Sequence, residues 1–202
     1  MVKEIGDEIR QLIQSVNAPF VVGIDGLSGA GKTTFVKELE RELKKECPVT
    51  VIHLDDHIVK AERRYNTGYE QWYEYYSLQW DIEMLIASLF QNIHDAEEIT
   101  LPFYEKLMDS ITYKKIKLEP IILIEGVFLQ RNEWIKYYDF TIFLDCPKEL
   151  RYKRILKRDG FYEGMIDKYK RRYWPAEEYY LIYEKPMEQA SKIYRVTING
   201  KF

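Results

Sequence analysis

The amino-acid sequence predicts an α/β fold, in which a parallel sheet is covered by helices on both faces. Short, continuously apolar segments alternate with longer segments of helical periodicity, a pattern typical of parallel sheets that are buried on both sides. No repeat, low-complexity tract or flexible linker divides the chain. Since its 202 residues correspond to about one domain, at roughly 150 residues per domain, we expect a single domain over residues 1–202.

The first part of the chain contains two helices and two strands. Apolar side chains recur every three or four residues over 3–17, which predicts an amphipathic helix. A buried strand at 20–24 ends in a glycine-rich turn, and a helix continues from there to about residue 45. A second strand follows at 50–54, and a polar stretch rich in aromatic residues covers 61–79.

The remainder alternates in the same way. We expect a helix near 80–94 and a mainly helical region from 147 to about 190. Strands are predicted where apolar residues alternate or run continuously: 99–104, 111–119, 121–124, 140–144 and 194–198. Three strands end in carboxylates, Asp55, Glu125 and Asp145. Ligands bind beyond the carboxyl ends of parallel strands, so we expect the functional site there.

Charge and composition exclude several classes of protein. The chain has 30 Lys and Arg against 33 Asp and Glu, a net charge of −3, so a nucleic acid is not the expected partner. With 46% hydrophobic residues it is neither disordered nor fibrous. No segment approaches the ~20 apolar residues that span a bilayer, and charged residues occupy the place of a signal peptide's apolar region. Cys47 and Cys146 lack metal-ligand spacing. We therefore expect a soluble cytoplasmic protein with two structural thiols and no membrane partner.

Residues 26–33 carry a phosphate-binding motif. They fit G-x-x-x-x-G-K-[ST] at every fixed position, and they lie between a predicted strand and a predicted helix, which is where this motif forms a P-loop. Its glycines allow successive N–H groups to turn toward a phosphate, and the helix N-terminus adds partial positive charge. The fold class is therefore that of a P-loop NTPase.

The loop predicts a nucleoside triphosphate as ligand, with Mg²⁺ as its ion; we expect ATP, and the choice between ATP and GTP as donor stays open at the sequence level. Lys32 can reach the β- and γ-phosphates, and the Thr33 hydroxyl can bind Mg²⁺. The base-specific N-K-x-D sequence of GTPases is absent from the chain. The residues that we expect to contact ATP are Gly26, Leu27, Ser28, Gly29, Ala30, Gly31, Lys32, Thr33, Thr34 and Arg154.

Two acidic residues are candidates for the chemistry. Asp55 could orient an acceptor hydroxyl and accept its proton, a contribution of about 10²–10⁴-fold, although Asp56 and His57 are adjacent rivals. Capping of a helix is the alternative role for the two aspartates. Glu125 follows the strand 121–124 and could act on Mg²⁺ directly or through water, or be an ordinary solvated acid. The candidate metal ligands are Thr33, Glu125 and Asp55.

Arg151, Arg154 and Arg158 have the spacing i, i+3, i+7, which places them on one helix face. A solvated charged face would have the same spacing. Beside a phosphate site, however, the pattern favours a helical lid, over about 148–172, whose guanidinium groups hold the transferring phosphoryl group. We expect Arg158 to act in catalysis together with Lys32 and Asp55, and Arg154 to bind ATP.

From about residue 20 to 198 the chain resembles the uridine kinase family, within the wider group that includes phosphoribulokinase and pantothenate kinase. The residues similar to family motifs are the loop 26–34, Asp55, Pro102-Phe103-Tyr104-Glu105, Glu125-Gly126, Arg151-x-x-Arg154-x-x-x-Arg158-Asp159, Tyr169 and Pro175-Ala176. The resemblance implies ATP- and Mg²⁺-dependent phosphorylation of a nucleoside 5′-hydroxyl, with uridine or cytidine first. It also implies acceptor contacts from Asp55, Tyr104 and Arg151, and it suggests a homo-oligomer.

The departures from the family lie at the acceptor site. Asp109 stands where the family has a base-reading histidine, and Glu105 replaces an aspartate. Residues 71–76 replace the ribose-binding Asp-His-Pro segment, and residues 160–164 lack the family's Gly-Arg pair. Two alternatives therefore stay open: a kinase of another small hydroxyl acceptor, of nicotinamide riboside, pantothenate or sugar type, or a non-catalytic ATP-binding sensor.

Tyrosine is unusually frequent, with 17 residues. Eleven of them lie in two segments, 65–76 and 162–183. Amphipathic rings can stack on flat ligands, but they also serve ordinary helix packing. We expect these rings, Tyr73 and Tyr76 among them, to enclose the acceptor.

Overall fold

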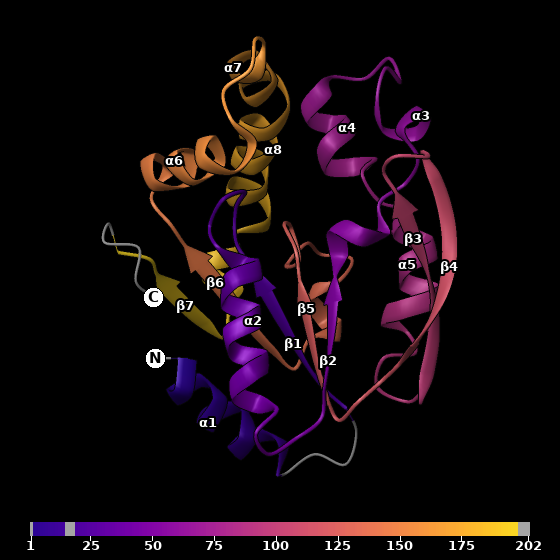
Figure 1. Cartoon of the computed structure of the whole chain (residues 1–202), viewed down its shortest axis with the longest axis vertical. Coiled ribbons are helices and arrows are strands. Elements are labelled where there is room, and N and C mark those ends of the chain that lie inside the picture. The colour runs from indigo at the N-terminus through magenta and orange to yellow at the C-terminus, as the bar shows by residue number, and fades with distance from the viewer. Residues whose placement is uncertain (1, 15–18, 198–202) are drawn as a thin grey trace.

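The computed structural model describes residues 2–14 and 19–197 (Figure 1). Within them, five strands form a parallel sheet in the order β2-β5-β1-β6-β7. The strands are β1 (Phe20–Asp25), β2 (Val49–His53), β5 (Ile121–Glu125), β6 (Phe140–Asp145) and β7 (Lys192–Arg195). The predicted α/β class is confirmed.

Both faces of the sheet are covered, as the apolar strands predict. Val21 and Ile122 belong to one hydrophobic cluster, whereas their neighbours Val22 and Leu123 belong to another, because successive side chains of a strand point to opposite faces. The second cluster also contains residues of α1 (Val2–Ile13) and α2 (Lys32–Leu43). Residues 15–17, at the end of the predicted first helix, lie outside the described residues.

Two groups of elements meet beyond the carboxyl ends of the strands, and the second of them then runs down beside the sheet to β7 (Figure 1). We call the first the cap; it consists of the 3₁₀ turn η1 (Leu54–His57), α3 (Ala61–Arg64) and α4 (Gln71–Ser77). We call the second the lid. It contains α6 (Lys148–Asp159), α7 (Met165–Lys168), η4 (Tyr169–Tyr173), α8 (Trp174–Tyr179), η5 (Tyr180–Glu184) and α9 (Pro186–Gln189).

The two strands predicted at 99–104 and 111–119 form a separate antiparallel hairpin, β3 (Glu98–Glu105) and β4 (Ser110–Lys117), beside the parallel sheet. A short 3₁₀ turn, η3 (Ile135–Tyr137), precedes β6. No helix of the described residues is long and apolar enough to cross a membrane. Both cysteines are free thiols.

Two predicted elements have different bounds in the structure. The helix expected near 80–94 comprises α5 (Ile82–Leu85) and η2 (Ile86–Phe90), and the Asn92 side chain bonds the Ala87 carbonyl beyond its end. The last strand begins two residues before the predicted 194–198, because Ser191 and Thr141 exchange hydrogen bonds of 3.0 Å that align β7 with β6. Residue 198 lies outside the described residues.

Candidate active site

The predicted P-loop connects β1 to α2 in the expected position. Gly31 precedes α2 with φ +102°, and Gly29 has φ +79°, both in the left-handed region that favours glycine. A side chain at Gly29 would also collide with the lid, since its Cβ would lie 2.8 Å from the carbonyl oxygen of Arg151. Glycine at position 29 thus allows the left-handed backbone conformation of the turn and leaves room for the close approach of α6.

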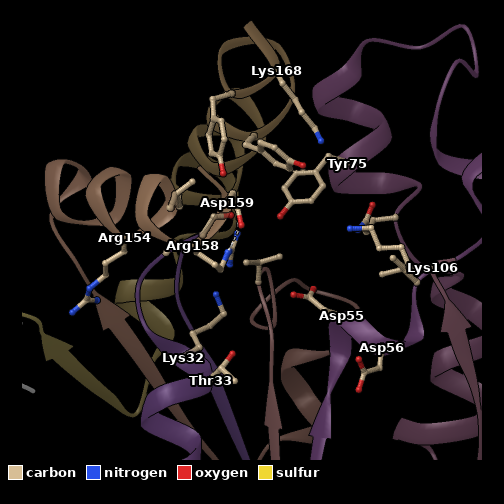
Figure 2. A pocket seen from close by; sticks show the side chains of 18 of the residues that line it. Lys32, Thr33, Asp55, Asp56, Tyr75, Lys106, Arg154, Arg158, Asp159 and Lys168 are labelled. Atoms are coloured by element: carbon tan, nitrogen blue, oxygen red, sulfur yellow. Dashed lines mark hydrogen bonds and ion pairs between the residues drawn. The ribbon is translucent and has the colours of Figure 1, made fainter. Parts of the chain in front are cut away.

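Lys32 lies at the start of α2 with its side chain folded into the loop. Its Nζ donates to the Gly26 carbonyl at 2.8 Å, and only 8% of the residue is exposed. Figure 2 shows the ammonium group at the floor of the cavity, next to Thr33. This placement suits a cation that neutralises the β- and γ-phosphates.

The lid holds the P-loop from behind through a buried ion pair. Arg151 Nη1 contacts Glu177 Oε2 at 2.9 Å. The pair binds both sides of residue 28, because Glu177 Oε1 accepts from the Ser28 amide at 2.9 Å and Arg151 Nη1 donates to the Ser28 carbonyl at 3.0 Å. Arg151 is therefore committed to the loop and is not among the residues that line the cavity. The expected acceptor contact of Arg151 is wrong, because burial against Ser28 turns its guanidinium away.

The other two lid arginines lie closer to the expected positions. Arg154 Nη1 donates to the Ala30 carbonyl at 2.8 Å, so it supports the P-loop from the side. Arg158 faces the cavity and forms two hydrogen bonds with Asp159, at 2.7 and 2.8 Å (Figure 2). Burial raises the pKa of Asp55, and the positive charge of Arg158 counteracts a small part of this rise. Arg154 and Arg158 of the predicted clamp thus both line the cavity, whereas Arg151 does not.

A second buried anchor joins the P-loop to the lid. Asp25, at the end of β1, accepts from the Gly26 amide at 2.7 Å, from Gln130 Nε2 at 3.1 Å and from the Tyr180 hydroxyl. Burial raises the pKa of this carboxyl group, although its hydrogen bonds and Lys32 counteract part of the rise. The sequence analysis missed Asp25 and Glu177. An acid ending an otherwise apolar strand was a signal for Asp25, whereas the partners of Glu177 come from distant segments.

Asp55 lies in η1, immediately after β2, and faces the cavity opposite Lys32 (Figure 2). Its carboxylate is accessible from the cavity but surrounded by protein. This enclosure, with the charges of Glu125 and Asp56, raises its pKa, and Lys32 and Arg158 counteract part of the rise. A raised pKa makes a carboxylate a stronger base. Of its two predicted rivals, His57 is buried with Nδ1 2.6 Å from the Pro102 carbonyl, whereas Asp56 also lines the cavity.

Thr33 and Glu125 form the candidate Mg²⁺ site. Thr33 Oγ1 donates to Glu125 Oε1 at 2.9 Å, and His53 Nδ1 lies 2.8 Å from the same oxygen. Burial raises the pKa of Glu125, but the hydrogen bonds from His53 and Thr33 and the charge of Lys32 outweigh it and lower the pKa. Among the described residues no cluster of three His, Cys, Asp or Glu could hold a metal alone. The oxygens of Thr33 and Glu125 suit Mg²⁺, whose other ligands would include phosphate oxygens.

The cavity extends from the P-loop to the space between cap, hairpin and lid, with a volume of about 1060 Å³. Its tyrosines come from all three of these regions. Six of them line it: Tyr65, Tyr75, Tyr104, Tyr162, Tyr169 and Tyr173. Five of the six belong to the two tyrosine-rich segments of the sequence, and the sixth is Tyr104.

Two tyrosines expected at the acceptor do not line the cavity. Tyr76 is buried behind it, with its hydroxyl 2.6 Å from Glu184 Oε1. Tyr73 packs on Tyr69 and Trp72, at ring centroid distances of 4.9 and 5.9 Å. The prediction for this pair is wrong because α4 turns Tyr75, and not its neighbours, toward Asp55.

Tyr104 lines the cavity, as the resemblance implied. Its hydroxyl donates to Asp109 Oδ1 at 2.9 Å, and the same oxygen accepts from the Ala61 amide at 2.9 Å. Asp109, which replaces the family's histidine, thus links the hairpin to the start of α3.

A P-loop at the carboxyl edge of a parallel sheet, with Thr33 and Glu125 beside it and a facing aspartate, defines the class: a P-loop nucleotide-binding protein of the kinase type. The chain belongs to the phosphoribulokinase/uridine kinase family, whose model matches residues 21–192. Membership of this family makes it a small-molecule kinase that uses ATP.

Similar proteins carry the name uridine kinase. The uridine kinase of Lactobacillus helveticus is 28% identical over 156 residues, which cover 73% of this chain and 71% of that protein. That of Oceanobacillus iheyensis is 30% identical over 149 residues, with 70% and 68% covered. A solved structure described as a possible uridine kinase from Bacillus stearothermophilus is 38% identical, covers 96% of this chain and 98% of its own, and has a TM-score of 0.78.

The fold is also shared with a kinase of a different acceptor. The D-glycerate 3-kinase from Cryptococcus neoformans superposes with a TM-score of 0.71, covering 100% of this chain and 97% of its own, at 13% identity. At this identity the likeness concerns the fold alone.

Proposed function

We propose that the protein transfers the γ-phosphoryl group of ATP to the 5′-hydroxyl of a nucleoside, with uridine or cytidine as the first candidates. The observation that carries the proposal is the position of Asp55, which faces Lys32 and the P-loop across one continuous cavity. An acceptor hydroxyl between Asp55 and the γ-phosphate would be aligned for in-line transfer. The uridine kinase relatives support a nucleoside as the acceptor.

The residues of the cavity would divide the work as follows. Asp55 accepts the proton of the attacking hydroxyl as the new O–P bond forms and the bond to the β–γ bridging oxygen breaks. Lys32 and Arg158 hold the negative charge of the transferring group and of the leaving diphosphate. Thr33 and Glu125 would hold Mg²⁺, which when bound supplies further charge neutralisation on the phosphates. Because such transition states are loose, positioning and charge neutralisation dominate over proton transfer.

The proposal is tested by incubating the protein with ATP, Mg²⁺ and a pooled nucleoside library and analysing the products by mass spectrometry. The expected result is a nucleoside 5′-monophosphate together with a stoichiometric amount of ADP. If ATP is consumed at the same rate without any acceptor, or if no nucleoside gains a phosphate, the proposal is refuted.

A second candidate is a kinase of another small hydroxyl compound. It is favoured by the acceptor end, where Asp109 is engaged by Tyr104 and Ala61 and where residues 71–76 contribute Tyr75 to the cavity. Competition between uridine, cytidine, nicotinamide riboside, pantothenate and simple sugars separates the two. ATP consumption that depends strictly on an added acceptor would exclude a non-catalytic sensor.

A further inference from the structure

Arg64, the last residue of α3, is a buried cation that lines the cavity. Only 7% of the residue is exposed. Its Nε donates to the Val59 carbonyl at 2.9 Å, and the guanidinium lies 4.8 and 5.0 Å from the ring centroids of Tyr65 and Tyr104. These contacts orient the guanidinium, but none of them neutralises its charge.

Arg64 differs in this respect from the other buried arginines of the described residues. Each of those has a carboxylate within 3.0 Å, since a buried charge is costly unless it is paired. The pairs are Arg131–Glu133, Arg151–Glu177 and Arg172–Glu74. No carboxylate oxygen of the described chain lies within 4.0 Å of an Arg64 guanidinium nitrogen, the distance that defines an ion pair.

The only other buried Lys or Arg without such a pair, among the residues described, is Lys32. Lys32 and Arg64 line the same cavity. The counter-charge of Lys32 is the triphosphate, which is a ligand and not a part of the chain. The parallel indicates that Arg64 also receives its counter-charge from a ligand.

Two lysines add positive charge at the same end. Lys106 and Lys168 line the cavity and, in Figure 2, lie at the end away from Lys32. Neither has an ion pair within the described chain. Their charges, after the stronger effect of Arg158, help to lower the pKa of Asp159, which Arg158 already engages with two hydrogen bonds. One carboxylate is thus shared by three cations.

The acidic residue near Arg64 is Asp109, which forms no ion pair with it. Asp109 is exposed and accepts its hydrogen bonds from Ala61 and Tyr104, which together with the charge of Arg64 lower its pKa. It is not among the residues that line the cavity. In a chain with a net charge of −3, the cavity lining nevertheless has an excess of positive charge, with six Lys and Arg (Lys32, Arg64, Lys106, Arg154, Arg158 and Lys168) against four Asp and Glu (Asp55, Asp56, Glu125 and Asp159).

We propose that the acceptor carries an anionic group, a carboxylate or a phosphate, and that Arg64 binds it, with Lys106 and Lys168 completing the anion site. The hydroxyl group that is phosphorylated lies at the opposite end of the acceptor from its anionic group, where it faces Asp55. This inference rests on the proposed function in one respect, the transfer of a phosphoryl group to a hydroxyl at Asp55, and it replaces the neutral uridine and cytidine by an acidic nucleoside, a hydroxy acid or a sugar phosphate. Guanidinium groups suit both oxyanions because they donate in a planar fork.

The test uses acceptor pairs that differ by the anionic group alone. These are uridine with orotidine, nicotinamide riboside with nicotinic acid riboside, and glycerol with glycerate and with glycerol 3-phosphate. Phosphorylation of each compound and its binding to the ATP-free protein by calorimetry are measured in parallel. Within the preferred pair, the anionic member is expected to show a KM and a Kd lower by about tenfold or more. The glycerol series distinguishes a carboxylate from a phosphate.

Variants then assign the effect to Arg64. Arg64→Met is expected to abolish the preference for the anionic member while the KM for ATP stays unchanged, and Arg64→Lys is expected to retain part of the preference. Arg63→Met is the matched control, because Arg63 is exposed and pairs with Asp81 at 2.9 Å outside the cavity. A purely structural role of Arg64 would change the kinetics of both members of a pair equally.

The outcomes separate this inference from the proposed function. If neutral nucleosides are phosphorylated as well as their anionic partners, the inference is overturned and the proposed function stands. If no compound is phosphorylated, the proposed function fails. The inference is then decided by the binding data, and equal Kd values within every pair, or a preference that survives Arg64→Met, would overturn it.

Discussion

The phosphate end and the acceptor end of the cavity are built in different ways. The phosphate end is made by one contiguous segment, residues 26–33, at the junction of β1 and α2. The acceptor end is assembled from the cap, the hairpin and the lid, which contribute Arg64, Tyr75, Tyr104 and Lys168. A local motif can therefore specify ATP binding, whereas the choice of acceptor depends on how separate segments pack.

The two ends also differ in how firmly they are held. Buried hydrogen bonds hold the P-loop from behind: Asp25 and Glu177 accept from its amides, and Arg151 donates to the Ser28 carbonyl. At the acceptor end, the lid segment between Gly160 and Gly164 exposes Phe161 by 74% and has open space around both glycines. A rigid phosphate end and a less constrained acceptor end are consistent with one family using a common donor and varied acceptors.

The largest expected effect lies at the phosphate end. Lys32→Ala removes the cation at the floor of the cavity and is expected to lower kcat by about 10³-fold or more, because charge on the transferring group is left without its buried partner. The measurement is steady-state kinetics at saturating ATP. Lys37→Ala, on the exposed side of the same helix, is the control. Activity within about twofold of the wild type for Lys32→Ala would contradict the assignment.

Asp55 lies where the two ends of the cavity meet. The Asp55→Asn substitution is expected to lower kcat by about 10²–10⁴-fold while the protein stays folded. The wild-type kcat/KM should fall as the pH drops through the raised pKa of Asp55, because the base becomes protonated, and the residual activity of the variant should lack this step. A variant that keeps the wild-type pH profile would show that another group is the base.

The stability of this variant follows from the same pKa. Because the folded-state pKa of Asp55 is raised, the folded protein binds more protons than the unfolded chain between the ordinary and the raised pKa, so its stability falls as the pH rises through that interval. At neutral pH the ionised carboxylate of Asp55 therefore lowers the stability of the folded protein. Asp55→Asn should have a melting temperature at least equal to that of the wild type, and a large decrease would indicate a structural role.

The anchoring of the P-loop is tested by Glu177→Gln, which leaves Arg151 buried without its counter-charge. Breaking a buried ion pair costs about 3–5 kcal/mol, which corresponds to a melting temperature lower by about 10 °C in a chain of this size. Since Glu177 also positions the Ser28 amide, the KM for ATP should rise while the KM for the acceptor stays unchanged. Glu178→Gln, at the exposed neighbour, should change neither value.

The smallest effects are expected at the tyrosines of α4. Tyr75→Phe removes a hydroxyl that lines the cavity and should raise the acceptor KM by about two- to tenfold. Tyr73→Ala, on the outer side, should leave it unchanged. An equal effect of both substitutions would mean that the rings act through the packing of the cap and not through contact with the acceptor.

Much of the phosphate end was predictable from the sequence. The P-loop, Thr33, Glu125 and Asp55 all lie at or directly after strands, so the order of strands and motifs along the chain implied their meeting at one edge of the sheet. The roles of the lid arginines were not predictable to the same degree. Helical spacing placed Arg151, Arg154 and Arg158 on one face, but the P-loop is so close to α6 that Arg151 is buried against Ser28.

The tyrosine-rich segments show the same limit. Their composition indicated that they contribute rings to the cavity, and both segments do so. The choice of Tyr75 over Tyr73 and Tyr76 depends on the rotation of α4 against Phe128 and Tyr173, which Tyr75 contacts at ring centroid distances of 5.4 and 4.8 Å. A rotation of one residue, 100° in an α-helix, would exchange their environments.

The sequence by itself therefore determined the α/β class, the P-loop and the acidic edge of the sheet, because these depend on contiguous residues and on local periodicity. Only the tertiary structure decided which charges are neutralised within the protein and which remain for a ligand. Arg151 and Arg64 are both buried arginines, yet Glu177 reaches one of them and no carboxylate of the described chain reaches the other. That difference arises from the packing of segments far apart in the chain, because a buried charge is neutralised only by groups that the fold brings within a few ångströms.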